Sequence, residues 1–479
     1  MELLYAALQS GVASLASYLA AHVLLCLVPA FFIAGALSAL VPQQSIVRFL
    51  GPDAPKWVAY PAAAGAGSLL AVCSCTVQPL FAGIYGRGAG LGPAVTFLFF
   101  APAGNILALS YTGVALGADF AIARVVLSLA FGIGIGMIMA LLFHRDDTAR
   151  LADAAVFAGG EGISRRAVVF LIALIALLIA GTLKLDFLTA RLVSFDIALS
   201  GAPPAQALLD RLVPVDTIKG EEGLSLQGTA LIVVLALIGA TALRGFGKVD
   251  EGFNRLTTLT LGLIAATLIF AALGVQATAG GLNLVVTGRS IAVIVLLAVL
   301  VPLARRFEAW DLQQWLWETW RFVRMIFPLL IAGVFLVGVI RLFIRPEWIQ
   351  AIAGDNTVTA NLAGVVFGVF MYFPTLVEVP IAKMFLSLGM HPGPLIAYLM
   401  ADPELSLQSI LITAAIIGKL KAWTYVGLVA LFSTASGLAY GAWVDGVPIA
   451  AIAVAIAGFV FVVVAALHFT EKYRSPATA

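Results

Sequence analysis

Runs of about 20 or more predominantly apolar residues recur along almost the whole chain, and this is the length at which a helix can cross a bilayer. Hydrophobic residues make up 62% of the 479 residues and charged residues only 11%, whereas about a quarter of an ordinary soluble chain is charged. This composition excludes a cytosolic enzyme, a nucleic-acid-binding protein and a disordered scaffold. We therefore expect an all-α polytopic membrane protein in contact with the lipid bilayer. The candidate segments lie at 17–41, 58–84, 91–116, 119–143, 166–188, 228–243, 256–276, 282–304, 322–343, 358–382, 390–418, 422–443 and 447–469.

Proline interrupts four of these segments. Segments 58–84 and 358–382 contain the strings VCSCTVQP and YFPTLVEVP, and two others, 91–116 and 390–418, contain Ala-Pro and Asp-Pro. Proline removes a backbone donor and clashes with the preceding turn, so we predict that these helices are broken. Broken backbone survives in lipid only where protein or a polar cavity covers it, which makes the breaks the first candidates for a functional site. The predicted breaks are at Pro79, Pro102, Pro374, Pro380 and Pro403.

The interrupted segments also match each other in pairs. Shifting the chain by 301 positions places Pro79 on Pro380 and Pro102 on Pro403, and it aligns two Gly-Pro pairs. We interpret this as an internal duplication. The predicted organisation is a first transport repeat at 1–143, a central region with four transmembrane helices at 144–304, a second repeat at 305–443, and a C-terminal transmembrane helix with a short cytoplasmic tail at 444–479.

The positions of basic residues predict that the two repeats are inverted. Arginine and lysine cluster at 145–166, 244–255, 305–324 and 419–421, and such clusters favour the cytoplasmic side. With these clusters inside and a long loop near 189–226 outside, matching segments run in opposite directions. This topology predicts about 11 spanning helices, with one re-entrant hairpin in each broken pair. A parallel duplication in which every segment spans is the alternative, and it would place one basic cluster on the wrong side.

The thiols form the strongest local signal. Cys73, Ser74 and Cys75 lie inside an interrupted segment, and thiolates are soft ligands that select Cu(I), Zn(II) and trivalent arsenic. Two cysteines one residue apart can face one centre if the backbone is extended, and we expect them to bind a metal or metalloid. The alternative is that both are small membrane-core residues. Cys26, in a continuous segment, is either a packing residue or a third thiol ligand.

Charged residues in apolar segments are the second signal. An ionised side chain at the centre of a span costs about 2.5–3.5 kcal/mol, so Glu378 and Asp402 indicate an internal cavity and a function in proton coupling. The alternative is a static internal pair with Lys383. Glu404 has the alternative function of a helix cap.

Neutral polar residues lie beside the same breaks. Gln78 and Asn105 either line a substrate path or satisfy freed backbone groups, and we include both, together with Thr375, in the predicted substrate site.

Two long strings resemble the signature blocks of the YraQ/ArsP-type permeases. They are VCSCTVQPLFAGIYGRGAGLGPAVTFLFFAPAGN and YFPTLVEVPIAKMFLSLGMHPGPLIAYLMADPELSLQSIL. The resemblance implies a polytopic permease of the bacterial inner membrane. Better-understood members expel trivalent organoarsenicals, and some relatives are associated with copper or zinc efflux. The family's Cys-Ser-Cys block maps to Cys73, Ser74 and Cys75, and its acidic block to Glu378 and Pro380.

These observations predict a proton-coupled secondary transporter, and not an enzyme, that moves a thiophilic metal or metalloid outward. The two cysteines would hold the substrate, and Glu378 and Asp402 would exchange protons. The rival hypothesis is a membrane oxidoreductase in which the same cysteines cycle between dithiol and disulfide. We expect no cofactor and no nucleic-acid partner, and the oligomeric state is left open, a homo-oligomer included.

Overall fold

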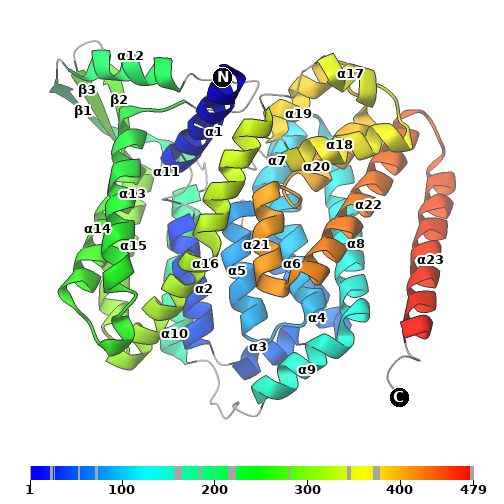
Figure 1. Cartoon of the computed structure of the whole chain (residues 1–479), viewed down its shortest axis with the longest axis horizontal. Helices are drawn as coiled ribbons and strands as arrows, with labels where there is room; N and C mark the ends of the chain where they lie inside the picture. Colours follow the sequence, from blue (N-terminus) through cyan, green and yellow to red (C-terminus); the bar gives the residue numbers. More distant parts are fainter. Residues whose placement is uncertain are drawn as a thin grey trace.

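A computed structural model describes most of the chain, which is almost entirely helical (Figure 1). The described residues are 2–21, 25, 27–41, 43–51, 54–70, 74–155, 164–182, 186–199, 201–213, 223–278, 281–341, 347–370 and 378–474. In this part of the chain, six helices are long and apolar enough to cross a membrane, by length and composition. These are α8 (Ala118–Leu142), α10 (Arg165–Thr182), α13 (Leu226–Gly245), α14 (Arg255–Ala272), α16 (Ala309–Arg341) and α22 (Lys419–Val444).

Shorter apolar helices complete two groups on either side of the central region. The first group contains α1 (Glu2–Ala21), α2 (Val28–Leu40), α3 (Gln43–Leu50), α4 (Lys56–Leu70), α5 (Ser74–Gly86), α6 (Leu91–Ala103), α7 (Ile106–Ala115) and α8, and α9 (His144–Ala155) follows it. The second group contains α16, α17 (Glu347–Ala353), α18 (Val358–Phe370), α19 (Glu378–Ser387), α20 (Pro392–Ala401), α21 (Leu407–Ile417) and α22, and α23 (Ile449–Arg474) follows it.

Helices α4 to α8 and α18 to α22 follow one another in the same order, and their turns agree at positions 301 residues apart. Gly88 and Gly389 both have positive φ, 95° and 89°, and so do the glycines that precede α8 and α22, Gly117 and Gly418. Glycine adopts this left-handed backbone without the steric cost that a Cβ brings. The two groups therefore share their turn geometry as well as their helix order.

The corresponding long helices run in opposite directions. In α8 and α22, Phe120 lies 5.0 Å from Tyr440 and Phe131 lies 5.0 Å from Phe432, ring centre to ring centre, so the start of one helix contacts the end of the other. Figure 1 shows the same relation between α1–α2 and α16, which pack side by side along their length.

Helices α4 and α5 leave one end of the molecule and return to it. Lys56 at the start of α4, Gly90 after α5 and His144 after α8 line a single cavity of about 370 Å³. Helices α18 and α19 do the same at the opposite end, where the N–H of His391 donates to the Ala353 oxygen at 2.9 Å. In Figure 1, α6 and α7 continue in one direction, as do α20 and α21.

The prolines differ in their effect on the helices. The prediction of a helix break at Pro79 is wrong, because α5 begins at Ser74 and continues through the proline, which removes one main-chain donor without ending the helix. Pro102 lies in the last turn of α6, Pro403 follows the end of α20, and Pro380 lies in the first turn of α19. Pro374 lies outside the described residues.

The central region contains a small sheet that the all-α prediction did not include. It joins β1 (Arg191–Ala198), β3 (Gly281–Thr287) and β2 (Gly274–Thr278), in that order and antiparallel. Short helices α11 (Asp186–Thr189) and α12 (Ala202–Leu212) flank β1, and a 3-10 turn, η2 (Val249–Glu251), joins α13 to α14. Helix α15 (Gly288–Ala304) follows β3. Part of the loop predicted near 189–226 is therefore folded.

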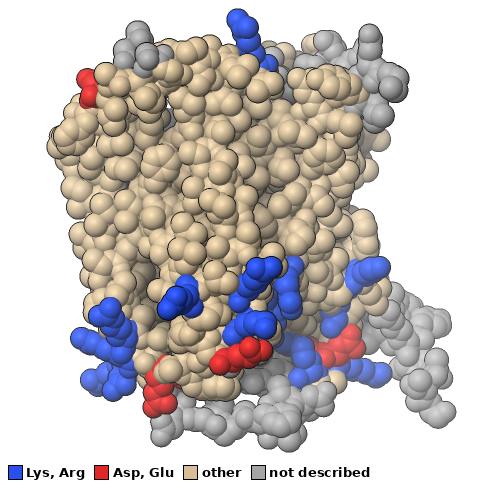
Figure 2. Space-filling view, turned by 60° about the vertical axis from the view of Figure 1, so that its left-hand side comes forward, with Lys and Arg blue, Asp and Glu red and all other residues tan. Residues whose placement is uncertain are grey.

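Basic side chains gather at the end of the molecule opposite the sheet (Figure 2). Lys421 Nζ lies 3.4 Å from Asp146 Oδ2, and Arg166 Nη1 donates to the Arg306 oxygen at 3.2 Å. These contacts place three of the basic clusters predicted from sequence at one end.

Candidate functional site

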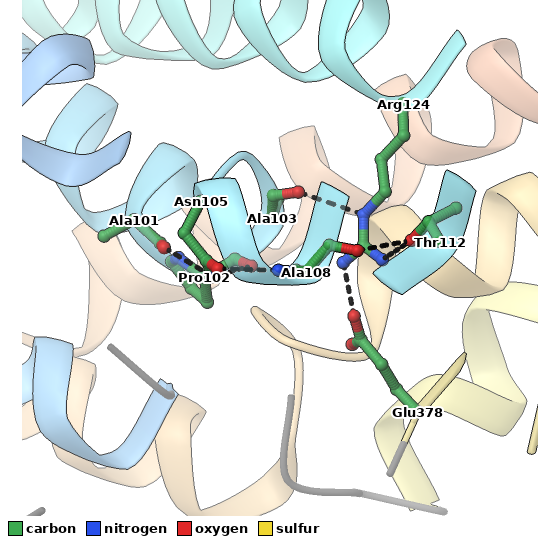
Figure 3. Close-up of polar contacts among 8 residues, drawn as sticks. All are labelled: Ala101, Pro102, Ala103, Asn105, Ala108, Thr112, Arg124 and Glu378. Carbon is green, nitrogen blue, oxygen red and sulfur yellow. Dashed lines mark hydrogen bonds and ion pairs between the residues drawn. The ribbon is translucent and has the colours of Figure 1, made fainter. Parts of the chain in front are cut away.

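A buried ion pair connects the two groups of helices (Figure 3). Arg124 of α8 and Glu378 at the start of α19 are both fully buried, and Arg124 Nη2 lies 2.5 Å from Glu378 Oε1. The same guanidinium donates through Nε to the Ala103 oxygen at 3.0 Å and through Nη1 to Thr112 Oγ1 at 3.1 Å. One side chain therefore joins the ends of α6, α7 and α19.

The break between α6 and α7 presents one of these acceptors. Asn105 caps α7, since its Oδ1 accepts from the Ala108 N–H at 2.9 Å, and its Nδ2 donates to the oxygens of Ala101 and Pro102 at 3.1 and 3.0 Å. The carbonyl of Ala103, next along the chain, then faces Arg124. These contacts fit the alternative in which Asn105 satisfies freed backbone groups.

The ion pair is costly to bury and costly to break. Removing a charged group from water costs several kcal/mol, and mutual attraction offsets this only when other hydrogen bonds are also made. Arg124 has such bonds in Ala103 and Thr112, whereas Glu378 Oε2 has no hydrogen-bond partner in the described part of the chain. One carboxylate oxygen of Glu378 is thus left for a proton or a ligand.

A second buried carboxylate lies in the same electrostatic environment. Glu404 Oε2 accepts from the hydroxyl of Tyr425 at 2.6 Å, and the carboxyl groups of Glu404 and Glu378 interact electrostatically. Glu404 does not cap α21, because Ser406 does so by accepting from the Ser409 N–H. Asp402 is fully buried at the end of α20, and its function in proton exchange stays a prediction.

The comparisons with known proteins agree with this membrane architecture. A family model described as a predicted permease matches residues 9–442. The chain belongs to this family. The UPF0718 protein MJ0584 of Methanocaldococcus jannaschii is 32% identical over 424 residues, which cover 88% of this chain and 93% of the relative. No solved structure matches. The family resemblance inferred from the two signature blocks is confirmed, and the protein is a multi-pass membrane permease.

The permease's predicted thiol site lies largely outside the described residues. Cys73, Thr375 and Cys26 are not described, whereas Ser74 and Cys75 form the first turn of α5. The extended backbone expected for two adjacent thiol ligands is therefore not found at Ser74 and Cys75, since both are helical. Metal or substrate binding by the cysteines stays a prediction.

Gln78 joins the permease's two groups of helices at a second point. It is buried on α5, and its Oε1 accepts from Thr413 Oγ1 of α21 at 3.2 Å. Substrate binding by this amide stays a prediction.

Arg124 was not among the residues predicted from sequence, and it takes the place of Lys383 as the cation paired with Glu378. Lys383, the cation considered from sequence, is exposed on α19. The sequence does contain a signal for Arg124, because it is the only charged residue inside the apolar run FAIARVVLSLAFG. A lone arginine in a predicted span indicates a buried partner in the same way as a lone carboxylate does.

Proposed function

We propose that this permease is a proton-coupled secondary transporter that exports a thiophilic metalloid species resembling a trivalent organoarsenical. The observation that carries the proposal is the Arg124–Glu378 ion pair, which is buried between the two groups of helices and lies at the ends of interrupted helices. Intramembrane ionisable residues are rare and cluster on the substrate and proton pathways of transporters.

The architecture we propose for this function is a pair of inverted repeats in the bacterial inner membrane. The end rich in arginine and lysine would be cytoplasmic. Hairpin α4–α5 would then re-enter from the cytoplasm and hairpin α18–α19 from outside. Inverted repeats whose broken helices meet near the midplane are typical of secondary transporters. The opposite directions of α8 and α22 support this arrangement.

Coupling would depend on the charge of Glu378. A proton on Glu378 removes its negative charge and therefore the ion pair, while Arg124 keeps its bonds to Ala103 and Thr112. Helix α19 packs against α7, so loss of the ion pair would release one group of helices from the other. Loss of the proton would restore the attraction and draw α19 back. Asp402 is the second proton carrier in this proposal.

Substrate binding would use the thiols of Cys73 and Cys75, with Ser74, Gln78 and Thr375 nearby in the predicted site. Thiolate binding releases protons, so a carboxylate that accepts them during loading and returns them during release is a suitable partner. Copper or zinc efflux would use the same ligands. A thiol oxidoreductase would instead consume an oxidant and produce no flux.

The test is transport by the purified protein in vesicles with an imposed pH gradient, with methylarsenite, Cu(I) and Zn(II) as separate probes. We expect Cys73→Ser and Cys75→Ser each to abolish flux and leave membrane insertion intact. Unchanged flux in the double variant would remove the thiols from the mechanism.

The coupling step is tested separately with Glu378→Gln. We expect this variant to lose gradient-driven flux but to keep substrate exchange at equal pH on both sides, because the amide keeps the shape of the carboxyl group and cannot ionise. Lys383→Gln, on the exposed side of the same helix, is the control and should transport normally. Full gradient-driven flux by Glu378→Gln would show that the pair is structural.

A further inference from the structure

An apolar cavity separates the central helices from the first and second groups. It has a volume of about 310 Å³ and lies between α2, α13, α14 and α16. Its lining includes Phe31, Ile238, Ile264 and Phe327, and no acidic side chain contributes to it. Gly239 lines the cavity and is exposed, so the cavity opens at the side of the protein where lipid chains would lie.

The one charged residue in the cavity wall is Arg324. Within the described residues it has no hydrogen bond or ion pair, whereas the neighbouring Arg321 is paired with Glu318 at 2.8 Å. Arg324 is exposed, so its guanidinium is free to bind an anionic group that reaches the cavity from the bilayer. Arg324 lies one turn after Trp320, which also lines the cavity.

Other basic residues lie next to the cavity lining in the sequence. The last turn of α13 forms part of the lining, and it carries Arg244, with Lys248 beginning the turn to α14. The last turn of α13 and the turn to α14 lie at the end of the molecule opposite the sheet (Figure 1). The cavity lining therefore carries one positive charge and is otherwise almost entirely apolar, and two more basic residues follow its α13 side in the chain.

We propose that this cavity binds an anionic phospholipid from the leaflet at the basic end. One acyl chain lies in the cavity, and the phosphate contacts Arg324 with Arg244 and Lys248 beside it. The bound chain fills the space between the central helices and α16, next to Pro328, where α16 lacks a main-chain donor. The site gives the central region a function in holding the two groups of helices together.

The experiment measures lipid retained by the full-length protein, by native mass spectrometry after exchange into phosphatidylglycerol or phosphatidylcholine. We expect a preference for phosphatidylglycerol of about fivefold for each basic residue that contacts the phosphate. Glycerol phosphate, which lacks acyl chains, should not displace the lipid. Equal retention of the two lipids, or displacement by glycerol phosphate, would overturn the proposal.

Two variants test the two parts of the site. A Cβ at Gly239 meets no atom within 4 Å, so Gly239→Leu fills the cavity without a clash and should lose the bound lipid. Arg324→Gln should lower the preference for phosphatidylglycerol by about fivefold. Gly262→Leu is the matched control, because Gly262 lies on α14 in equally open space, outside the cavity lining, and it should retain lipid.

Melting temperature and elution volume establish that each variant is folded. Retention of phosphatidylglycerol by folded Gly239→Leu would contradict the proposal as directly as a preference unchanged in Arg324→Gln.

Discussion

Helices α8 and α22 occupy corresponding places in the two groups, yet they carry different chemistry at the same point. Arg124 of α8 donates to the Ala103 carbonyl at the end of α6. The residue 301 positions later is Tyr425 of α22, which donates to Glu404 beyond the end of α20, and Glu404 is itself 301 positions after Ala103. The donor and acceptor positions agree, but one group supplies a cation and the other a carboxylate.

This difference distinguishes contacts that maintain the fold from contacts that we propose to act in coupling. Both groups keep a long helix whose side chain donates to the break beside it, so the contact itself belongs to the scaffold. The charges differ, and the remaining donor of Arg124, Nη2, forms an ion pair with Glu378 in the other group of helices. In the proposed mechanism, this asymmetric charge distribution on a matched scaffold would let a proton on Glu378 change the contact between the two groups.

The largest effect is expected when the cation is removed. Arg124→Met leaves Glu378 buried without its partner, which should destabilise the protein by about 3–5 kcal/mol. The double variant Arg124→Met/Glu378→Met should recover most of that stability and still not transport. Thermal unfolding of the purified protein measures the first effect and vesicle flux the second.

Arg165→Met, at an exposed position on α10, is the control and should change stability by less than about 0.5 kcal/mol. If Arg124→Met melted like the control, the ion pair would not connect the groups as the structure indicates.

A smaller effect is expected at the corresponding position of α22. Tyr425→Phe removes the hydroxyl that donates to Glu404 and leaves a buried acceptor unpaired, which should cost about 1–3 kcal/mol. Gradient-driven flux should persist, because Arg124 and Glu378 are unchanged. A loss of flux as complete as in Glu378→Gln would mean that Tyr425 and Glu404 also take part in coupling. Coupling would then not depend on the Arg124–Glu378 pair alone.

The smallest effects should be equal in the two groups. Gly117 and Gly418 have φ of 112° and 88°, and a Cβ at either meets no atom within 4 Å. Their ψ values of 159° and 155° complete a backbone conformation that essentially only glycine adopts, so replacing either with alanine should cost only this strain, about 1–3 kcal/mol. Gly427→Ala, in open space within α22, controls for the added methyl group and should not destabilise. Clearly unequal losses at Gly117 and Gly418 would show that the two turns are not equivalent.

Much of the architecture could be predicted from local features of the sequence. Apolar length indicated the membrane helices, and Glu378 was recognised because a carboxylate is out of place in an apolar segment. Pro79 misled the prediction, since a proline near the start of a helix costs one donor and does not end it.

The missed features depend on contacts between distant parts of the chain. Arg124 and Glu378 are 254 residues apart, so neither residue type nor spacing indicated that they pair. The sheet was missed for the same reason, because β1 pairs with β3, whose residues follow two intervening helices of the membrane region.

The contact between Arg166 and Arg306 joins the two ends of the central region, and this limits the number of helices that the region can contain. The central region begins and ends at one end of the molecule, and α10, α13, α14 and α15 run along it in two outward and return pairs. If all four cross the bilayer, as predicted, the number of crossings there has to be even. Helices can be gained or lost there only in twos. Loss of a single one would turn the second group over and carry Glu378 away from Arg124, whereas loss of a pair would leave that contact in place. The rest of the protein therefore depends on an even number of helices in the central region more than on their sequences.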